Sequence, residues 1–200
     1  MVDHILYINL DQRTDRREST ENLLSGFSYE RIPAIKHEIG GIGTSMSHIK
    51  ALQYAIAKGW NHVLIMEDDM QWNNFEENYE KLKKFMKKPY DVIVLAGMLV
   101  SHDPETSKLY KSNCSGAYLV SRQYYTKLLG NFQKGLQLLL TKSYSIFTAS
   151  NSIKSNYNID IYWHRLQASD NWFIIPLCYC IEGYSDCDNK ITNWKQFFLT

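Results

Sequence analysis

A short apolar run at residues 62–66 ends abruptly in three consecutive carboxylates, Glu67, Asp68 and Asp69. A run of this length predicts an interior strand, because strands that are buried on both faces read as continuous apolar segments. The acids that follow would lie at the carboxyl end of that strand, the edge of an open α/β sheet where ligands bind. This one feature therefore predicts both a buried strand and a candidate site.

The segments around this run alternate between strand-like and helix-like patterns. Short apolar stretches predict further strands at residues 4–10, 29–35 and 91–97. Helix-like stretches lie between the strands, at residues 18–26, 45–58 and 75–86. This alternation predicts an α/β fold with a mostly parallel central sheet flanked by helices.

The pattern changes beyond Met98. Shorter strands are predicted near residues 108–110 and 117–120, and a helix between Arg122 and Leu140. Neither an internal repeat nor a linker interrupts the chain, so we expect a single domain whose C-terminal part is a smaller elaboration of the site. Pro33 places the strand at residues 29–35 at a sheet edge or in a bulge, since proline cannot donate to a central ladder.

Charge and hydropathy exclude several classes of protein. The chain has 22 Lys and Arg against 21 Asp and Glu, a formal charge of +1, which excludes a basic nucleic-acid binder and an acidic tail. No apolar stretch approaches the roughly 18 residues of a membrane span, and the first residues lack the pattern of a signal peptide. We therefore expect a soluble, cytoplasmic protein with no integral membrane segment.

Three adjacent carboxylates are unfavourable unless they share a cation. Hard oxygen ligands suit magnesium or manganese that bridges substrate phosphates. In an extended chain Glu67 and Asp69 would point to the side opposite Asp68. The same acids could instead form a turn that caps a helix starting near Asn73, and the residues alone leave both interpretations open.

A basic segment follows the first predicted strand. Arg13, Arg16 and Arg17 carry the donor fork that matches phosphate groups bidentately, although such runs also occur on solvated helix faces. Residues 40–43, Gly-Gly-Ile-Gly, could bring backbone amides to an anion at a helix start. They lack the P-loop pattern, and we interpret them as a turn.

Hydrolase and zinc chemistry find little support in the sequence. Ser47 and His48 are adjacent on a predicted helix, so their side chains point about 100° apart, and no G-x-S-x-G elbow is present. The six His residues include no H-E-x-x-H motif. Cys178 and Cys180 lie in apolar, strand-like surroundings that indicate reduced core thiols.

Several short blocks stand in a definite order along the chain. Residues 8–17 read INLDQRTDRR, residues 43–48 read GTSMSH and residues 64–69 read LIMEDD. In this order they resemble the I-N-L-x-x-R-x-D-R start, the G-C-x-x-S-H helix and the I-L-E-D-D strand end of glycosyltransferase family 25. That family includes lipooligosaccharide and collagen hydroxylysine galactosyltransferases. Later blocks extend the resemblance over nearly the whole chain, at residues 91–97, 116–122, 158–160 and 185–186.

The resemblance implies a GT-A fold and inverting, manganese-assisted transfer of a hexose from a UDP-sugar, most often UDP-galactose or UDP-glucose. The acceptor would be a hydroxyl on a glycan, a lipid-linked sugar or a hydroxylysine. Residues 1–100 would form the nucleotide-sugar half of one domain, and residues 101–200 the acceptor and catalytic half. Two positions depart from the family pattern: Thr44 replaces the usual Cys, and Asn158 stands where some members carry an acid.

Roles for the donor-site residues follow from the resemblance. Glu67 and Asp69 would hold the metal, directly or through water, and Asp68 would face the nucleotide ribose. Arg13 and Arg16 would bind the nucleotide or its phosphates.

The remaining roles concern the proton and the shape of the site. Asp160 is nominated as the base that takes the proton of the acceptor hydroxyl, and Ser47 and His48 are assigned to shaping the donor site. If the family used an acid at position 158 as base or ligand, this role would fall to Asp160 alone.

Two other functions stay open. A catalytically silent GT-A-like protein could bind sugars or serve a structural role. A metal-dependent phosphoesterase would need more His or Asp ligands than these blocks offer. The abundance of Asn, Lys, Ile and Tyr suggests an AT-rich genome, either bacterial or of a large virus.

Overall fold

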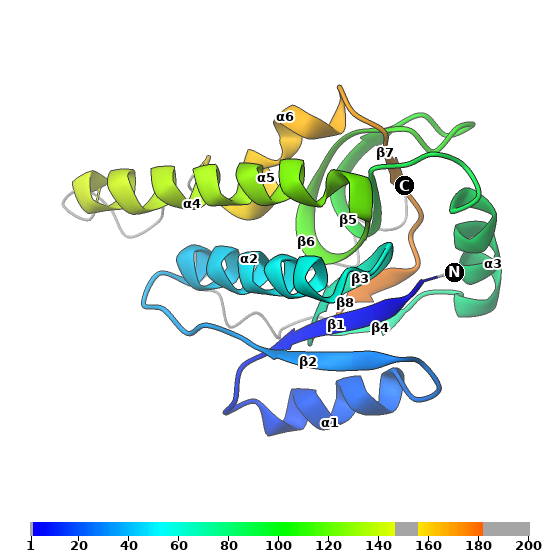
Figure 1. The fold of residues 1–200 in the computed structure, drawn as a ribbon, viewed down its shortest axis with the longest axis horizontal. Helices are drawn as coiled ribbons and strands as arrows, with labels where there is room; N and C mark the ends of the chain where they lie inside the picture. The colour runs from blue at the N-terminus through cyan, green and yellow to red at the C-terminus, as the bar shows by residue number, and fades with distance from the viewer. Residues whose placement is uncertain (1, 147–155, 182–200) are drawn as a thin grey trace.

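The computed structural model describes residues 2–146 and 156–181 (Figure 1). A six-stranded sheet lies at its centre, in the order β2-β1-β3-β6-β5-β7. The strands of this sheet are β1 (His4–Asn9), β2 (Tyr29–Pro33), β3 (His62–Glu67), β5 (Val92–His102), β6 (Leu109–Ser121) and β7 (Trp172–Ile174). A separate two-stranded sheet pairs β4 (Met70–Trp72) with β8 (Cys178–Cys180).

The central sheet has a parallel part and an antiparallel part. β1 pairs in parallel with β2 and β3, and β5 with β7, whereas β6 runs antiparallel to both β3 and β5. The predicted α/β fold with a central sheet is confirmed, and three of these five pairings are parallel. The two short strands predicted at residues 108–110 and 117–120 are instead parts of the single strand β6. The connection at residues 103–108 is too short for a parallel crossover, so β5 and β6 form an antiparallel pair.

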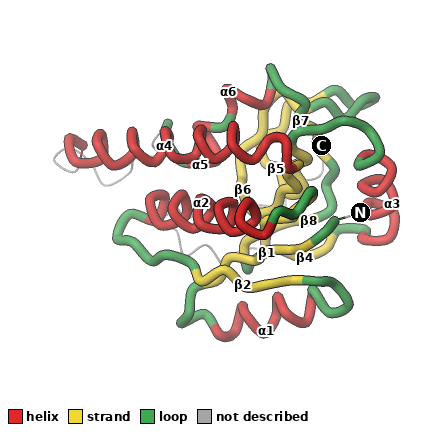
Figure 2. The backbone as a smooth tube through the Cα atoms, in the orientation of Figure 1, coloured by secondary structure: helices red, strands yellow, loops and turns green. Residues whose placement is uncertain are grey.

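Helices cover both faces of the sheet (Figures 1 and 2). Their bounds are α1 (Thr14–Leu23), α2 (Gly40–Lys58), α3 (Phe75–Phe85), α4 (Tyr125–Ile146), α5 (Ile159–Tyr162) and α6 (His164–Gln167), with a 3₁₀ turn η1 (Arg122–Tyr124) before α4. The helix predicted at residues 122–140 therefore begins with a 3₁₀ turn and runs further than expected. No helix in the described ranges is both long enough and apolar enough to span a membrane.

Successive side chains of each central strand point into two different apolar clusters, one on each face of the sheet. Leu6 and Ile8 of β1 pack in the cluster that also contains residues of α2 and α4. Ile5 and Tyr7 point to the opposite cluster, which contains Leu82 of α3. This period of two explains why β1 reads as a continuous apolar run, since both of its faces are buried.

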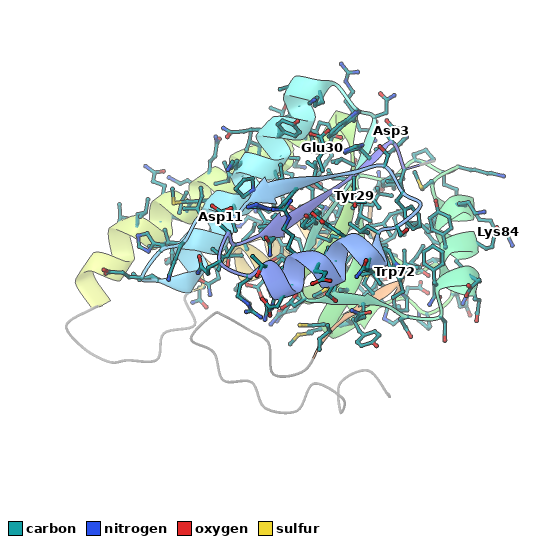
Figure 3. The ribbon with its side chains drawn as sticks, turned by 90° about the horizontal axis from the view of Figure 1, so that it is seen from below. Asp3, Asp11, Tyr29, Glu30, Trp72 and Lys84 are labelled. Carbon is teal, nitrogen blue, oxygen red and sulfur yellow. The ribbon has the colours of Figure 1, made fainter. Side chains whose placement is uncertain are left out.

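The sheet edge and the first helices position the loops that follow the strands. β2 lies at one end of the sheet and, among the strands of the described residues, pairs with β1 alone, as predicted from Pro33. Figure 3 shows α1 lying across β1 and β2, with Asp11 in the connection from β1 to α1. Trp72 of β4 lies beside the end of α1 and donates its indole N–H to the carbonyl of Leu23 at 3.1 Å.

Candidate functional site

A pocket of about 340 Å³ opens where β1, β2 and β3 end. This is the carboxyl edge of the parallel part of the sheet, where open α/β folds bind ligands. Its volume falls in the range of small-molecule sites. The predicted residues that line it are Arg13, Arg16, Ser47, His48 and residues 67–69.

Glu67, the last residue of β3, is held by two side chains on one of its oxygens. His48 Nε2 lies 3.1 Å from Glu67 Oε1, and the hydroxyl of Ser115 donates to the same oxygen at 3.2 Å. Burial by itself raises the pKa of Glu67, but the hydrogen bond and charge of His48, the hydrogen bond from Ser115 and the charge of Arg16 outweigh it and leave the pKa below its ordinary value. Glu67 is therefore an ionised carboxylate with a defined orientation.

Asp68 forms contacts with the end of β1 and with α1. Its Oδ2 accepts a hydrogen bond from the Asn9 amide at 2.6 Å, and its Oδ1 accepts one from Arg16 at 3.1 Å. Burial is the largest influence and raises the pKa of Asp68 despite these two partners. The interpretation of the acids as a helix cap is wrong. The N-cap residue of α3 is Asn74, no side chain forms a cap hydrogen bond there, and the acids form their hydrogen bonds with other residues.

The carboxylate of Asp69 has fewer hydrogen-bond partners than those of Glu67 and Asp68. Its Oδ2 accepts a weak hydrogen bond from the Cys180 thiol at 3.4 Å, while its buried Oδ1 has no hydrogen-bond partner. Burial first, and then the charge of Glu67, raise the pKa of Asp69 to about 7. A carboxylate oxygen of this kind is one that a cation would stabilise.

The arginines of the basic segment differ in their surroundings. Arg16 is 8% exposed, and its guanidinium lies 3.1 Å from Asp68 and 3.9 Å from Asp69. It therefore balances part of the charge of the acidic cluster, which sequence reasoning had assigned to a metal alone.

The other two arginines face outward to different degrees. Arg13 lines the pocket while its guanidinium forms a two-pronged pair with Asp15, at 3.0 and 2.8 Å. Arg17 is exposed, pairs with Glu21 one turn along α1 and does not line the pocket. For Arg17 the solvated helix face is the correct interpretation.

The glycine-rich residues 40–43 form the first turn of α2, so the interpretation of them as a turn outside the helix is wrong. A Cβ at Gly43 would lie 2.5 Å from the backbone oxygen of Ile35, so only glycine permits this approach of α2 to the loop after β2. Ser47 stabilises this contact between α2 and the loop after β2. Its hydroxyl donates to the Gly43 carbonyl at 2.7 Å and accepts from the Ile35 N–H at 2.8 Å. Ser47 thus shapes one wall of the pocket.

Asp160 lies in the first turn of α5 and outside the pocket lining. Its Oδ2 accepts a hydrogen bond at 3.3 Å from the backbone N–H of Cys114, a residue with a left-handed φ of 75°. Burial, followed by the charges of Glu67, Asp160 and Asp69, raises the pKa of the Cys114 thiol. Glu67, Asp69 and Asp160 are therefore all neighbours of Cys114.

The residues present fit a cation held partly by substrate. Within the described ranges no group of three or more His, Cys, Asp or Glu side chains forms a ready metal cage. Magnesium-like cations commonly use one or two protein carboxylates together with substrate phosphates. The unpartnered Oδ1 of Asp69 and the oriented carboxylate of Glu67 supply such a pair.

Several site residues were not identified from the sequence. Asn9, Ser115, Tyr118 and Cys180 all contact the carboxylates or His48. Asn9 and Tyr118 stood in motif blocks without an assigned role, and no local signal marks Ser115 or Cys180, which β6 and β8 bring in from distant parts of the chain. The block at residues 185–186 lies outside the described residues.

Comparison with known sequences gives one relative. No protein-family model matches the chain. It is 29% identical to "Putative glycosyltransferase R655" of Acanthamoeba polyphaga mimivirus, in an alignment that covers 60% of this chain and 46% of that protein. The chain thus spans about half the length of this relative.

Two solved structures share the fold. A glycosyltransferase involved in the glycosylation of the major capsid of PBCV-1 aligns with a TM-score of 0.56 and 12% identity, over 91% of this chain and 93% of that one. A mutant of Drosophila β1,4-galactosyltransferase 7, in complex with manganese, UDP-Gal and xylobiose, aligns with a TM-score of 0.52 and 12% identity, over 98% and 79%. The chain has the GT-A fold and is glycosyltransferase-like in general terms.

Proposed function

We propose that the protein is a hexosyltransferase, similar to family 25, that moves galactose or glucose from a UDP-sugar to a hydroxyl acceptor with inversion. The observation that carries this proposal is Asp69, whose buried Oδ1 has no hydrogen-bond partner although the residue lines the pocket. A divalent cation, manganese by preference, would satisfy this oxygen and the phosphates of the donor together. The GT-A fold and the mimivirus relative support the transferase class.

Asp69 and Glu67 would hold the metal, directly or through water. When bound, the metal supplies positive charge to the diphosphate that leaves the sugar. Arg16 and the hydrogen bonds to Asp68 keep the rest of the acidic cluster in place whether or not a cation is bound.

The donor would lie against α1, α2 and the strand ends. Arg13 lines the pocket and is placed to bind the nucleotide or its phosphates. The first turn of α2 also lines the pocket and offers the positive end of a 19-residue helix to an anion. Asp68 uses one hydrogen bond on each oxygen, and a carboxylate accepts about four, so it can still accept from the ribose hydroxyls.

Inversion requires a base on the acceptor side. We assign this role to Asp160, which would take the proton of the acceptor hydroxyl as its oxygen attacks the anomeric carbon. Asp160 lies outside the donor pocket but near the metal-binding carboxylates through Cys114, which suits a group that acts on the second substrate.

The acceptor is proposed to be a hydroxyl on a glycan, a lipid-linked sugar or a hydroxylysine. The PBCV-1 enzyme takes part in glycosylation of a capsid protein, and the mimivirus relative is also viral. Both support the proposed large-virus origin of the chain. Residues 1–100 would form the donor half and residues 101–200 the acceptor half.

A donor screen tests this function. Purified protein is incubated with UDP-galactose, UDP-glucose and UDP-N-acetylglucosamine, with manganese or with EDTA, and UDP release is measured. We expect release with a hexose donor only when manganese is present, and a loss of about 100-fold or more in Asp69→Asn. Glu105→Ala removes an exposed carboxylate that does not line the pocket, and it should leave the rate unchanged. No release with any donor would favour the catalytically silent scaffold.

A further inference from the structure

Three buried side chains form a hydrogen-bond network that ends on Glu67. His48 and Tyr118 are both 0% exposed and Ser115 is 5% exposed. Tyr118 OH lies 3.0 Å from His48 Nδ1, His48 Nε2 lies 3.1 Å from Glu67 Oε1, and the Ser115 hydroxyl donates to the same oxygen at 3.2 Å. We infer that His48, Tyr118 and Ser115 are positioning residues that fix one rotamer of Glu67 for cation binding, an inference that rests on the proposed function.

The hydrogen bonds determine which nitrogen of His48 carries a proton. An ionised carboxylate only accepts hydrogen bonds, so His48 must donate to Glu67 through an Nε2–H. With the ring neutral, Nδ1 accepts from the Tyr118 hydroxyl; with the ring charged, Nδ1–H donates to the Tyr118 oxygen, and Nε2–H faces Glu67 in either case. Burial, with the charge of Glu67, raises the pKa of Tyr118 and keeps its proton in place.

The surrounding core prevents these side chains from turning. Tyr118 lies opposite Ile65 in the β3–β6 ladder, and its ring packs edge-on against Trp163 at 5.7 Å and Phe132 at 6.4 Å. The same ring stacks on His48 at 5.7 Å. Because Phe132 and Trp163 enclose the Tyr118 ring, which stacks on His48, Glu67 cannot rotate without breaking buried contacts.

The arrangement assigns different tasks to the two oxygens of Glu67. The hydrogen bonds from His48 and Ser115 both fall on Oε1, and these two residues make no contact with Oε2, the oxygen left for a ligand. Outer partners of metal-binding groups typically change metal affinity or activity by 10- to 100-fold when they are removed.

Two substitutions at His48 separate positioning from packing. In His48→Gln the amide nitrogen reaches as far as Nε2 and can still donate to Glu67. In His48→Asn the amide reaches only as far as Nδ1, so the contact with Glu67 is lost. We expect His48→Asn to weaken manganese binding, measured by calorimetry without donor, by about tenfold or more, and His48→Gln to remain within about threefold of wild type.

A second readout does not depend on metal or catalysis. The ¹⁵N spectrum of the metal-free protein should show Nε2 of His48 carrying a proton, and Tyr118→Phe should shift its Nδ1 resonance. Tyr124→Phe is the matched control, because it removes a buried hydroxyl that donates to Asp170 and accepts from Trp172, residues that neither line the pocket nor contact His48.

The outcomes distinguish this inference from the proposed function. Equal losses of manganese affinity in the Gln and Asn variants, or a bare Nε2 in the spectrum, would overturn the positioning role while donor turnover could still stand. A protonated Nε2 together with a wild-type protein that releases no UDP would support the network and refute the transferase.

Discussion

Asp69 shows how a single buried carboxylate can favour function over stability. Its raised pKa means that the folded protein prefers the protonated form, so this contribution to stability is full near pH 4 and is lost as the pH rises through about 7. A rise from 3.8 to about 7 corresponds to roughly 4 kcal/mol at about 1.4 kcal/mol per unit. Replacement by a neutral isostere should therefore stabilise the metal-free protein.

We predict that Asp69→Asn unfolds at higher urea concentration than wild type at pH 8 in EDTA, with a gain of about 2 kcal/mol, about half of that full shift. The gain should shrink as the pH falls and disappear near pH 4, where Asp69 is protonated in both the folded and the unfolded protein. The measurement is urea unfolding at both ends of this pH range. Parallel pH profiles for the two proteins would show that Asp69 is not desolvated as described.

Arg16 and Arg17 test the difference between a buried and an exposed ion pair. Arg16→Ala leaves the buried carboxylate of Asp68 without its cation, and we predict a loss of about 3–5 kcal/mol in the free energy of unfolding. Arg17→Ala breaks an exposed pair with Glu21 and should cost less than about 0.5 kcal/mol. Chemical denaturation of both variants measures this difference, and similar losses would contradict it.

At the scale of elements, the fit of α2 against the β2 loop decides the shape of the pocket. We predict that Gly43→Ala destabilises the protein by about 1–3 kcal/mol, because its Cβ would meet the Ile35 backbone at 2.5 Å. The displaced loop lines the pocket, so the apparent KM for the UDP-sugar should rise as well.

Gly130→Ala is the control for helix propensity. Gly130 is exposed on α4, and a Cβ there would meet no atom within 4 Å. Alanine should therefore stabilise the protein by about 0.5–1 kcal/mol without changing turnover. If both glycine variants were stabilised alike, the close approach at Gly43 would not exist in solution.

The strands and helices themselves were largely predictable. Residues 62–66 and 91–97 read as interior strands because both of their faces are buried, and the apolar spacing of residues 45–58 marks one face of α2. The first turn of α2 was missed because glycines disfavour helices locally. Here tight packing on Ile35 overrides that propensity.

For the whole molecule, the nearly neutral net charge conceals opposed local charges. Arg16 lies among the carboxylates at the ends of β3, so the fold already balances much of the site. We predict that EDTA alone shifts the melting temperature by less than about 1 °C. Differential scanning fluorimetry measures this, and a large loss would indicate a structural metal.

Ligand binding should stabilise the molecule only when both components are present. UDP with manganese, at about 100 times its Kd, should add about 2.7 kcal/mol, which corresponds to roughly 5–10 °C for a chain of this size. UDP in EDTA, or the Asp69→Asn protein with UDP and manganese, should give no comparable shift. Equal shifts with and without metal would point to a nucleotide site that does not use the carboxylates.

The sequence by itself determined the α/β class, the edge position of β2 and the placement of three acids at the end of a buried strand. Each of these follows from a local pattern, either an alternation of apolar residues or a residue type with a fixed backbone preference. It could not reveal that β6 runs antiparallel between β3 and β5.

Only the tertiary structure decided what each acid does. Glu67 is oriented by Ser115, 48 positions away, Asp68 by Asn9, 59 positions away, and Asp69 meets Cys180, 111 positions away. These contacts depend on strand order and register, which set the distances between segments that are remote in the chain. The charge, burial and free oxygen of each carboxylate arise from those contacts, so identical residue types in one motif acquire three different environments.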